Sequence, residues 1–130
     1  MPLVQHPHFV YHRTINVDLA VSRLASAIGE PARARILYSL MDGHARTSTE
    51  LAIVARVSPS TASAHLARLT TERLIKVFIQ GKHRYYSLEG PRVARALEGL
   101  SVLAGARFVP TTPIRLRATR TWAEPSEPPS

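Results

Sequence analysis

Apolar residues recur three or four positions apart over most of this chain, which is the spacing of one helix face. The first apolar stripe consists of Val17, Val21, Leu24 and Ile28. Asn16 is a suitable N-terminal cap for this helix, and Gly29 is a suitable C-terminal stop. The residues before Asn16 include Pro2 and Pro7, so we expect them to form an extended arm.

Two more helices are predicted by caps and apolar positions between residues 31 and 57. Pro31 opens the first of them, and Gly43 ends it. Its buried positions are Ile36, Leu37, Leu40 and Met41. The next helix begins at Thr47 or Ser48, where Glu50 is placed to complete a capping box with Thr47.

The segment from Ser58 to Arg73 predicts a fourth helix with two unlike faces. Ser58 is a favoured N-cap, and Pro59 suits the first helical position because its φ is already set. The buried face carries Ala62, Leu66 and Leu69. The opposite face is small, polar or basic and carries Ser60, Ser63, Ala64, Ala67, Arg68 and Thr71. Because the preceding helix can cover the buried face with Leu51 and Val54, the pair has the layout of a helix-turn-helix.

A two-stranded hairpin and a last helix are predicted next. Residues 74–79 and 83–88 are typical of strands, and Gly81 lies at their tip, where a positive φ is needed. Gly90 breaks the hairpin and Pro91 opens the last helix. The apolar seam of this helix consists of Val93, Leu97, Leu100 and Ala104. The seam is either a dimer contact or a face that packs on the chain's own core.

These elements predict a mainly α fold with a small β-hairpin, a winged helix-turn-helix that forms a homodimer through its terminal helices. We expect an N-terminal arm at residues 1–14 and a DNA-binding and dimerisation domain at residues 15–105. Residues 106–130 are rich in proline, so we expect a disordered tail there.

The composition favours a polyanionic partner. The formal net charge is +8, and nucleic acid is the commonest polyanion for a small basic chain. There is no cysteine, which excludes disulfides, thiolate metal sites and thiol redox sensing. No apolar run approaches the ~20 residues of a membrane span. Residues 1–14 lack the charged and apolar regions of a signal peptide, so we expect a cytoplasmic protein with no membrane partner.

Three segments resemble the arsenic-repressor-type (ArsR/SmtB) transcriptional repressors. EPARARILYSL is similar to their second helix, VSPSTASAHLARL to their recognition helix, and LTTERLIKVFIQGKHRYYSL to their wing. The resemblance covers roughly residues 17–104, and winged helices of the MarR and IclR types share parts of it. It implies a homodimer that binds an operator near its own promoter and releases it when an effector arrives.

The chain departs from this family pattern in two places. Ala64 stands before His65, where the family often has an arginine, so one DNA contact is missing or is supplied by Arg68. The third and last helices, ELAIVARV and PRVARALEGLSVLAG, contain neither Cys nor His, so the metal sites that the resemblance implies for those helices are absent.

The candidate DNA-binding residues lie on the fourth helix and at the hairpin tip. They are Ser60, Thr61, Ser63, His65, Arg68, Lys82, His83 and Arg84. The hydroxyls can bond base edges or phosphates, and the basic tip can reach the minor groove or flanking phosphates. For His65, which lies beside the buried stripe, a structural role is the alternative.

Metal binding and catalysis find little support. His6, His8 and His12 form one loose metal-like group, for which a plain surface arm is the alternative. There is no nucleophile elbow, no glycine-rich phosphate loop and no paired-carboxylate spacing, so we exclude an enzyme and expect no cofactor.

We therefore predict a DNA-binding transcriptional regulator, a dimeric repressor that binds an operator through the helix at 58–73 and the wing at 75–88. The alternative is a winged-helix protein-interaction module without sequence-specific DNA binding. The effector stays open between a small molecule in the dimer interface, a histidine-bound metal and none.

Overall fold

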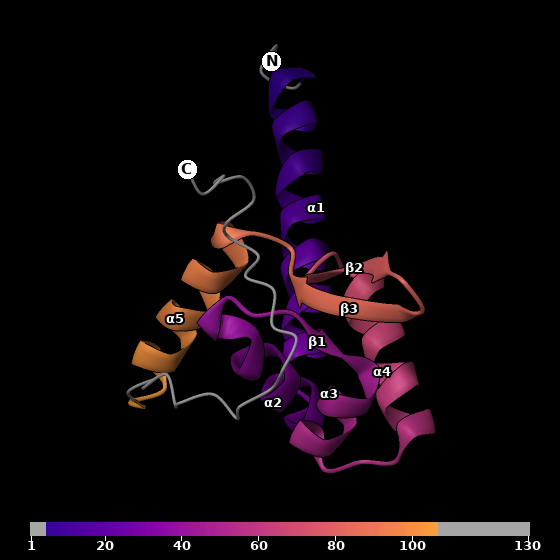
Figure 1. Ribbon diagram of the computed structural model, residues 1–130. Coiled ribbons are helices and arrows are strands. Elements are labelled where there is room, and N and C mark those ends of the chain that lie inside the picture. Colours follow the sequence, from indigo (N-terminus) through magenta and orange to yellow (C-terminus); the bar gives the residue numbers. More distant parts are fainter. Residues whose placement is uncertain (1–4, 107–130) are drawn as a thin grey trace, which may run out of the picture.

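The structure is a computed structural model (Figure 1). Its described part consists of five α-helices, one 3-10 turn and three short strands. The structure describes residues 5–106, and it describes side chains from residue 16 onward. The elements in chain order are α1 (Gln5–Ile28), α2 (Pro31–Ser39), η2 (Leu40–Asp42), β1 (Arg46–Thr47), α3 (Ser48–Ala55), α4 (Pro59–Thr71), β2 (Ile75–Gln80), β3 (His83–Leu88) and α5 (Pro91–Leu103). None of these helices is long and apolar enough to cross a membrane.

Helix α1 begins eleven residues before the position predicted for it. Its backbone is helical from Gln5, so the expected extended arm is wrong for residues 5–14, and Asn16 lies inside the helix. Pro7 is tolerated because it lies in the first turn, where a backbone N–H has no acceptor within the helix. The helix ends before Gly29 as predicted, and it extends well beyond the rest of the chain (Figure 1).

The next two helices begin at the predicted residues, but α2 ends at Ser39 and the last residues before Gly43 form the 3-10 turn η2. Pro31 opens α2, and Gly43 closes the following turn with a φ of 84°. Thr47 and Glu50 form the predicted capping box of α3, with N···O distances of 2.9 and 3.2 Å between backbone amides and side chains. The sequence had not indicated that the Glu30 carboxylate caps α2, where it accepts a hydrogen bond from the Arg33 backbone amide.

The sheet has a third strand that the sequence pattern did not predict. The order is β1-β3-β2, all antiparallel, and Gln80 pairs with His83 across a two-residue turn. Gly81 has a φ of 68° at the first turn position, as expected for a tight hairpin. Strand β1 contains Arg46, which is buried and donates two hydrogen bonds to the Asp42 carboxylate, at 3.1 and 2.9 Å.

One hydrophobic core joins all the layers. It contains residues from every helix and from strands β2 and β3, with Leu37, Leu51, Leu66, Leu88 and Leu97 all fully or almost fully buried. The Tyr38 hydroxyl donates a hydrogen bond to the Leu97 carbonyl and thereby ties α5 to α2. This core leaves α4 and the hairpin tip on one side of the molecule and α5 on the opposite side (Figure 1).

The predicted C-terminal tail lies almost wholly outside the described residues, because the description ends at Ala106. Its disorder and the domain boundaries at residues 15 and 105 therefore stay predictions.

Candidate nucleic-acid interface

Helix α4 is held at its N-terminus by the predicted cap. The Thr61 backbone amide donates to the Ser58 hydroxyl at 3.2 Å, and Pro59 occupies the first helical position. The hydroxyls of Ser60 and Thr61 lie 3.3 and 3.1 Å from the Ser58 hydroxyl, so three exposed hydroxyls meet at this end of the helix. This cluster, together with the free amides of the first turn, offers donors to a phosphate.

The outer face of α4 is exposed along its length. Ala62, Leu66 and Leu69 are buried as predicted, and Ser60, Ser63, Ala64, Ala67 and Thr71 are exposed. The middle of this face carries the two alanines, while the hydrogen-bonding side chains flank them. A face with such small side chains lets the helix backbone approach another surface closely.

His65 lies on the flank of α4 that faces the start of α2, and its side chain is 14% exposed, which supports the structural alternative; its part in DNA binding stays a prediction. Its Nδ1 lies 3.1 Å from Nη1 of Arg33, which can only donate, so this nitrogen accepts. Its Nε2 lies 3.7 Å from Oε1 of Glu30. The reason for the inward orientation is that the start of α2 presents a cation and a carboxylate to this flank of α4.

The Glu30 carboxyl is stabilised in its ionised form by this arrangement. The hydrogen bond from the Arg33 backbone amide lowers its pKa and outweighs the opposing effect of desolvation. The Arg33 Nε also donates to the Ala27 carbonyl at 2.7 Å. His65 thus connects α4 to the junction of α1 and α2.

Arg68 lies on the same flank of α4 as His65 and is only partly available. Its Nε is 3.4 Å from Oε2 of Glu72, and the same oxygen is 3.5 Å from Nη2 of Arg23 on α1. The Arg68 side chain remains 37% exposed, so its guanidinium can still reach solvent. The arrangement places a carboxylate in competition with any phosphate for this arginine.

The hairpin tip presents the three basic residues that the sequence indicated. Lys82, His83 and Arg84 are all exposed, and none forms an ion pair with a described residue. Behind them, the rings of Phe78 and Tyr85 stack with centroids 5.7 Å apart, which stiffens the hairpin. Figure 1 shows this tip on the same side of the molecule as α4.

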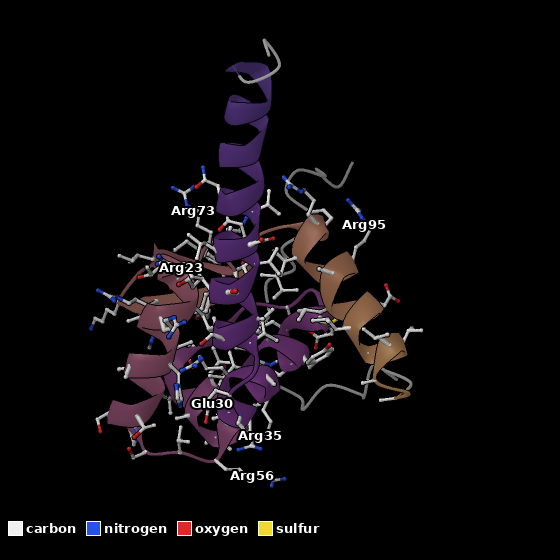
Figure 2. The ribbon with its side chains drawn as sticks, turned by 180° about the vertical axis from the view of Figure 1, so that it is seen from behind. Arg23, Glu30, Arg35, Arg56, Arg73 and Arg95 are labelled. Carbon is white, nitrogen blue, oxygen red and sulfur yellow. The ribbon has the colours of Figure 1, made fainter. Side chains whose placement is uncertain are left out.

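Sequence reasoning missed Arg56, in the turn between α3 and α4. Its backbone is left-handed, with a φ of 61°, and its side chain is exposed at one end of the molecule (Figure 2). A helix usually ends with glycine in this conformation. The arginine at this position, two residues before the Ser58 cap, is therefore unusual. This unusual residue type was the feature of the sequence that could have pointed to Arg56. The neighbouring Arg35 is used structurally, since it donates twice to the Ala55 carbonyl at the end of α3.

The four residues predicted for the dimer contact divide into two groups. Leu97 is 0% exposed and Val93 packs against the same core, so Leu97 is removed from the predicted interface. Leu100 and Ala104 are exposed and remain available to a partner. The seam was split because the first half of α5 covers the core and the second half extends beyond it.

The histidines considered for metal binding lie outside the described side chains. His6, His8 and His12 are on the first part of α1, of which only the backbone is described. Among the side chains from residue 16 to 106, no group of three or more His, Asp or Glu could hold a metal ion.

Comparisons with known proteins agree with the fold and the helix-turn-helix. Residues 30–77 match the family model of the bacterial regulatory proteins of the arsR family. The chain is 40% identical over 84 residues to the uncharacterized HTH-type transcriptional regulator YdfF of Bacillus subtilis, a match that covers 65% of this chain and 37% of YdfF. This chain therefore corresponds to little more than a third of that relative.

Two mycobacterial proteins match over more of their own length. The HTH-type transcriptional regulator CmtR of Mycobacterium tuberculosis is 35% identical over 80 residues, which cover 62% of this chain and 67% of CmtR. The homodimeric winged helix-turn-helix domain of a possible ArsR-family regulator from Mycobacterium bovis superposes with a TM-score of 0.66 and 29% identity, covering 72% of this chain and 85% of that one. The chain therefore belongs to the arsR family of bacterial regulatory proteins, and its fold and helix-turn-helix are those of DNA-binding transcriptional regulators.

Proposed function

We propose that this protein is a cytoplasmic homodimeric repressor that binds a double-stranded DNA operator through α4 and the β2–β3 wing. The observation that carries the proposal is the exposed outer face of α4 on the same side of the molecule as the basic hairpin tip. In helix-turn-helix proteins such a helix enters the major groove, and a basic tip adds contacts to phosphates or the minor groove. The net charge of +8 suits a polyanion.

The proposed contacts come from both ends of the interface. Ser60, Thr61 and Ser63 provide hydroxyls to base edges or phosphates, and Arg68 provides a phosphate contact when it leaves Glu72. Lys82, His83 and Arg84 provide the contacts of the wing. To these we add Arg56, which is exposed beside the N-terminus of α4 and forms no ion pair with a described residue.

Exposed apolar residues on the terminal helices support self-association. On α1, Val17, Leu19 and Val21 are each more than half exposed, and they precede Leu24 and Ile28, which pack on the core. On α5, Leu100, Val102 and Leu103 are exposed beyond the part that covers the core. A second copy that covers both helices would remove this apolar surface from water. A two-fold dimer would bind half-sites about 34–36 Å apart.

We propose that the cadmium response of one relative is absent from this chain. The CmtR structure is that of a cadmium metal sensor, with a TM-score of 0.54, 30% identity, and coverage of 74% of this chain and 99% of CmtR. Soft metal ions are held in proteins by thiolates, and this chain has no cysteine. We therefore propose a regulator that is indifferent to cadmium, arsenite and thiol oxidants.

Binding of the purified protein to DNA from upstream of its own gene tests the proposal. Fluorescence anisotropy should give salt-dependent, sequence-selective binding with two chains per operator. The Ser63→Glu variant should bind at least about tenfold more weakly, because a carboxylate on the outer face repels phosphates. Ser26→Glu, the same change at an exposed position of α1 beyond Val17, Leu19 and Val21, is the matched control and should bind as the wild type does.

Two results would contradict the proposal. Equal affinity for upstream and scrambled DNA would refute operator binding. Equal binding by the two serine variants would remove α4 from the interface and favour a winged-helix protein-interaction module instead.

A further inference from the structure

A cavity of about 630 Å³ lies where α1, the end of α4 and the start of α5 meet. Its apolar lining includes Leu24 and Ile28 of α1 and Val93 and Leu97 of α5. A volume of this size is within the roughly 300–1,000 Å³ of small-molecule sites, which are mostly apolar with a few polar groups. The cavity is distinct from the outer face of α4 and from the wing.

Four charged residues line the same cavity: Glu72, Arg73, Glu89 and Arg92. Glu72 already pairs with Arg68 and Arg23. Within the described part of the chain, the side chains of the other three form no ion pair and no hydrogen bond. The unpaired charge is therefore two arginines against one glutamate, which favours an anionic ligand.

Arg73 adds a second, independent observation. Its φ is 59°, and it and Arg56 are the two non-glycine residues with positive φ among the described residues. It follows Glu72, the C-cap of α4, and the backbone amides of Arg73 and Leu74 donate to the carbonyls of Thr70 and Leu69 and so close the helix. Glycine adopts this conformation without strain, so an arginine is an unfavourable residue there. Strain of this kind at a cavity points to a functional side chain.

We propose that this cavity binds a small amphipathic organic anion, with its apolar body on the α1 and α5 side chains and its acid group between Arg73 and Arg92. Arginine is suited to this role because its planar guanidinium donates two parallel hydrogen bonds to a carboxylate or related acid group. Figure 2 shows Arg73 on the side of α1 that carries Arg23, whereas Arg95 lies on the other side. Arg73 is thus separated from Arg95.

The cavity also has a route to the DNA-binding face. Glu72 lines it and holds Arg68, and Arg73 is joined directly to the end of α4. An anion at Arg73 changes the charge around Glu72 and the position of the last turn of α4. The ligand therefore changes operator affinity, a consequence that rests on the proposed function.

Binding is tested with two fluorescent probes that differ only in their acid group, on the full chain in the absence of DNA. The probes are 1-anilinonaphthalene-8-sulfonate and its uncharged analogue N-phenyl-1-naphthylamine. We expect saturable binding of one sulfonate probe per chain, about tenfold or more tighter than the analogue, because of the charge-assisted hydrogen bonds. Arg92→Ala and Arg73→Gly should abolish this difference, whereas Arg95→Ala, on the same helix outside the cavity, should preserve it.

Several results would overturn the proposal. The first is equal affinity of the two probes for the wild type, and the second is the same difference in probe affinity for Arg92→Ala and Arg95→Ala. The third is the absence of saturable binding, which is expected if a second copy of the chain covers the cavity. Operator affinity is then measured with and without the sulfonate probe, and Arg92→Ala should lose only the response to the probe. If the wild type does not bind the operator even without the probe, the proposed function is contradicted and the result on probe binding still stands.

Discussion

Replacing Arg56 with glycine should affect folding and DNA binding in opposite directions. The residue has a φ of 61°, and a left-handed backbone costs an L-residue about 1–2 kcal/mol. Glycine removes this cost but loses about 0.5–1 kcal/mol more conformational entropy on folding. No ion pair or hydrogen bond of the Arg56 side chain to another described residue is lost. The free energy of unfolding should therefore rise by about 0 to 1.5 kcal/mol.

The effect on DNA binding can be calculated from counterion release. Each phosphate contact contributes about −0.9 to the slope of log K against log salt, so two copies of Arg56 in a dimer contribute about −1.8. Between 50 and 200 mM salt, a fourfold range, this slope corresponds to about a 12-fold change in affinity. Arg56→Gly should lose that part of the salt dependence together with affinity at low salt.

Arg56→Ala separates the two effects. It removes the same guanidinium but keeps a side chain at the left-handed position, so it should bind DNA like Arg56→Gly without the gain in stability. Urea denaturation and anisotropy titrations at several salt concentrations measure both quantities. An unchanged salt slope in both variants would refute the phosphate contact, and a clearly less stable glycine variant would refute the strain argument.

Three further variants test other parts of the molecule. Burial alone raises the pKa of the Asp42 carboxyl, but hydrogen bonds from the Arg46 side chain and a backbone amide outweigh it and hold the pKa below the ordinary value of 3.8. The ionised Asp42 therefore stabilises the fold above that pH and less as the pH falls through its lowered pKa. Asp42→Asn should lower the free energy of unfolding by about 3 kcal/mol at pH 7, because it leaves Arg46 buried and unpaired. In urea denaturation, the difference from the wild type should be smaller near pH 3. An equal difference at both pH values would contradict this reasoning. Glu72→Gln should strengthen operator binding about 2- to 30-fold in an anisotropy titration, because it frees two copies of Arg68 from ion pairs worth about 0.2–1 kcal/mol each. Weaker binding would show that Glu72 positions Arg68 for DNA instead. Val21→Glu should raise the dimer dissociation constant about a hundredfold or more in sedimentation experiments, since it places a charge in the proposed apolar contact. An unchanged dissociation constant would show that this part of α1 is not in the interface.

Local interactions explain which elements could be predicted. The starts of α3 and α4 depend on side chains within three residues of the bonded amides, as with Thr47 and Glu50 or with Ser58. The hairpin tip depends on Gly81. These contacts are short-range in sequence, so the residue types at a fixed spacing are enough to specify them.

The start of α1 was mispredicted for a local reason as well. Proline disfavours a helix interior, but Pro7 lies in the first turn, where the missing backbone amide is not needed. The two-residue strand β1 is a different case, because its only support is the pairing of Arg46 and Thr47 with β3, some forty residues later in the chain.

Periodicity and caps are local properties, and they were enough to predict the order of the helices and the hairpin, the buried face of α4 and the basic character of the wing. The use of the polar side chains depends on contacts between elements that are distant in the chain. His65 is turned inward because the start of α2 brings Glu30 and Arg33 to it, and Arg23 of α1 reaches the Glu72 carboxylate that also pairs locally with Arg68. Such partners are separated by up to about 50 residues or belong to different helices. Their charges meet only after the core has packed, and no pattern along the chain specifies that meeting.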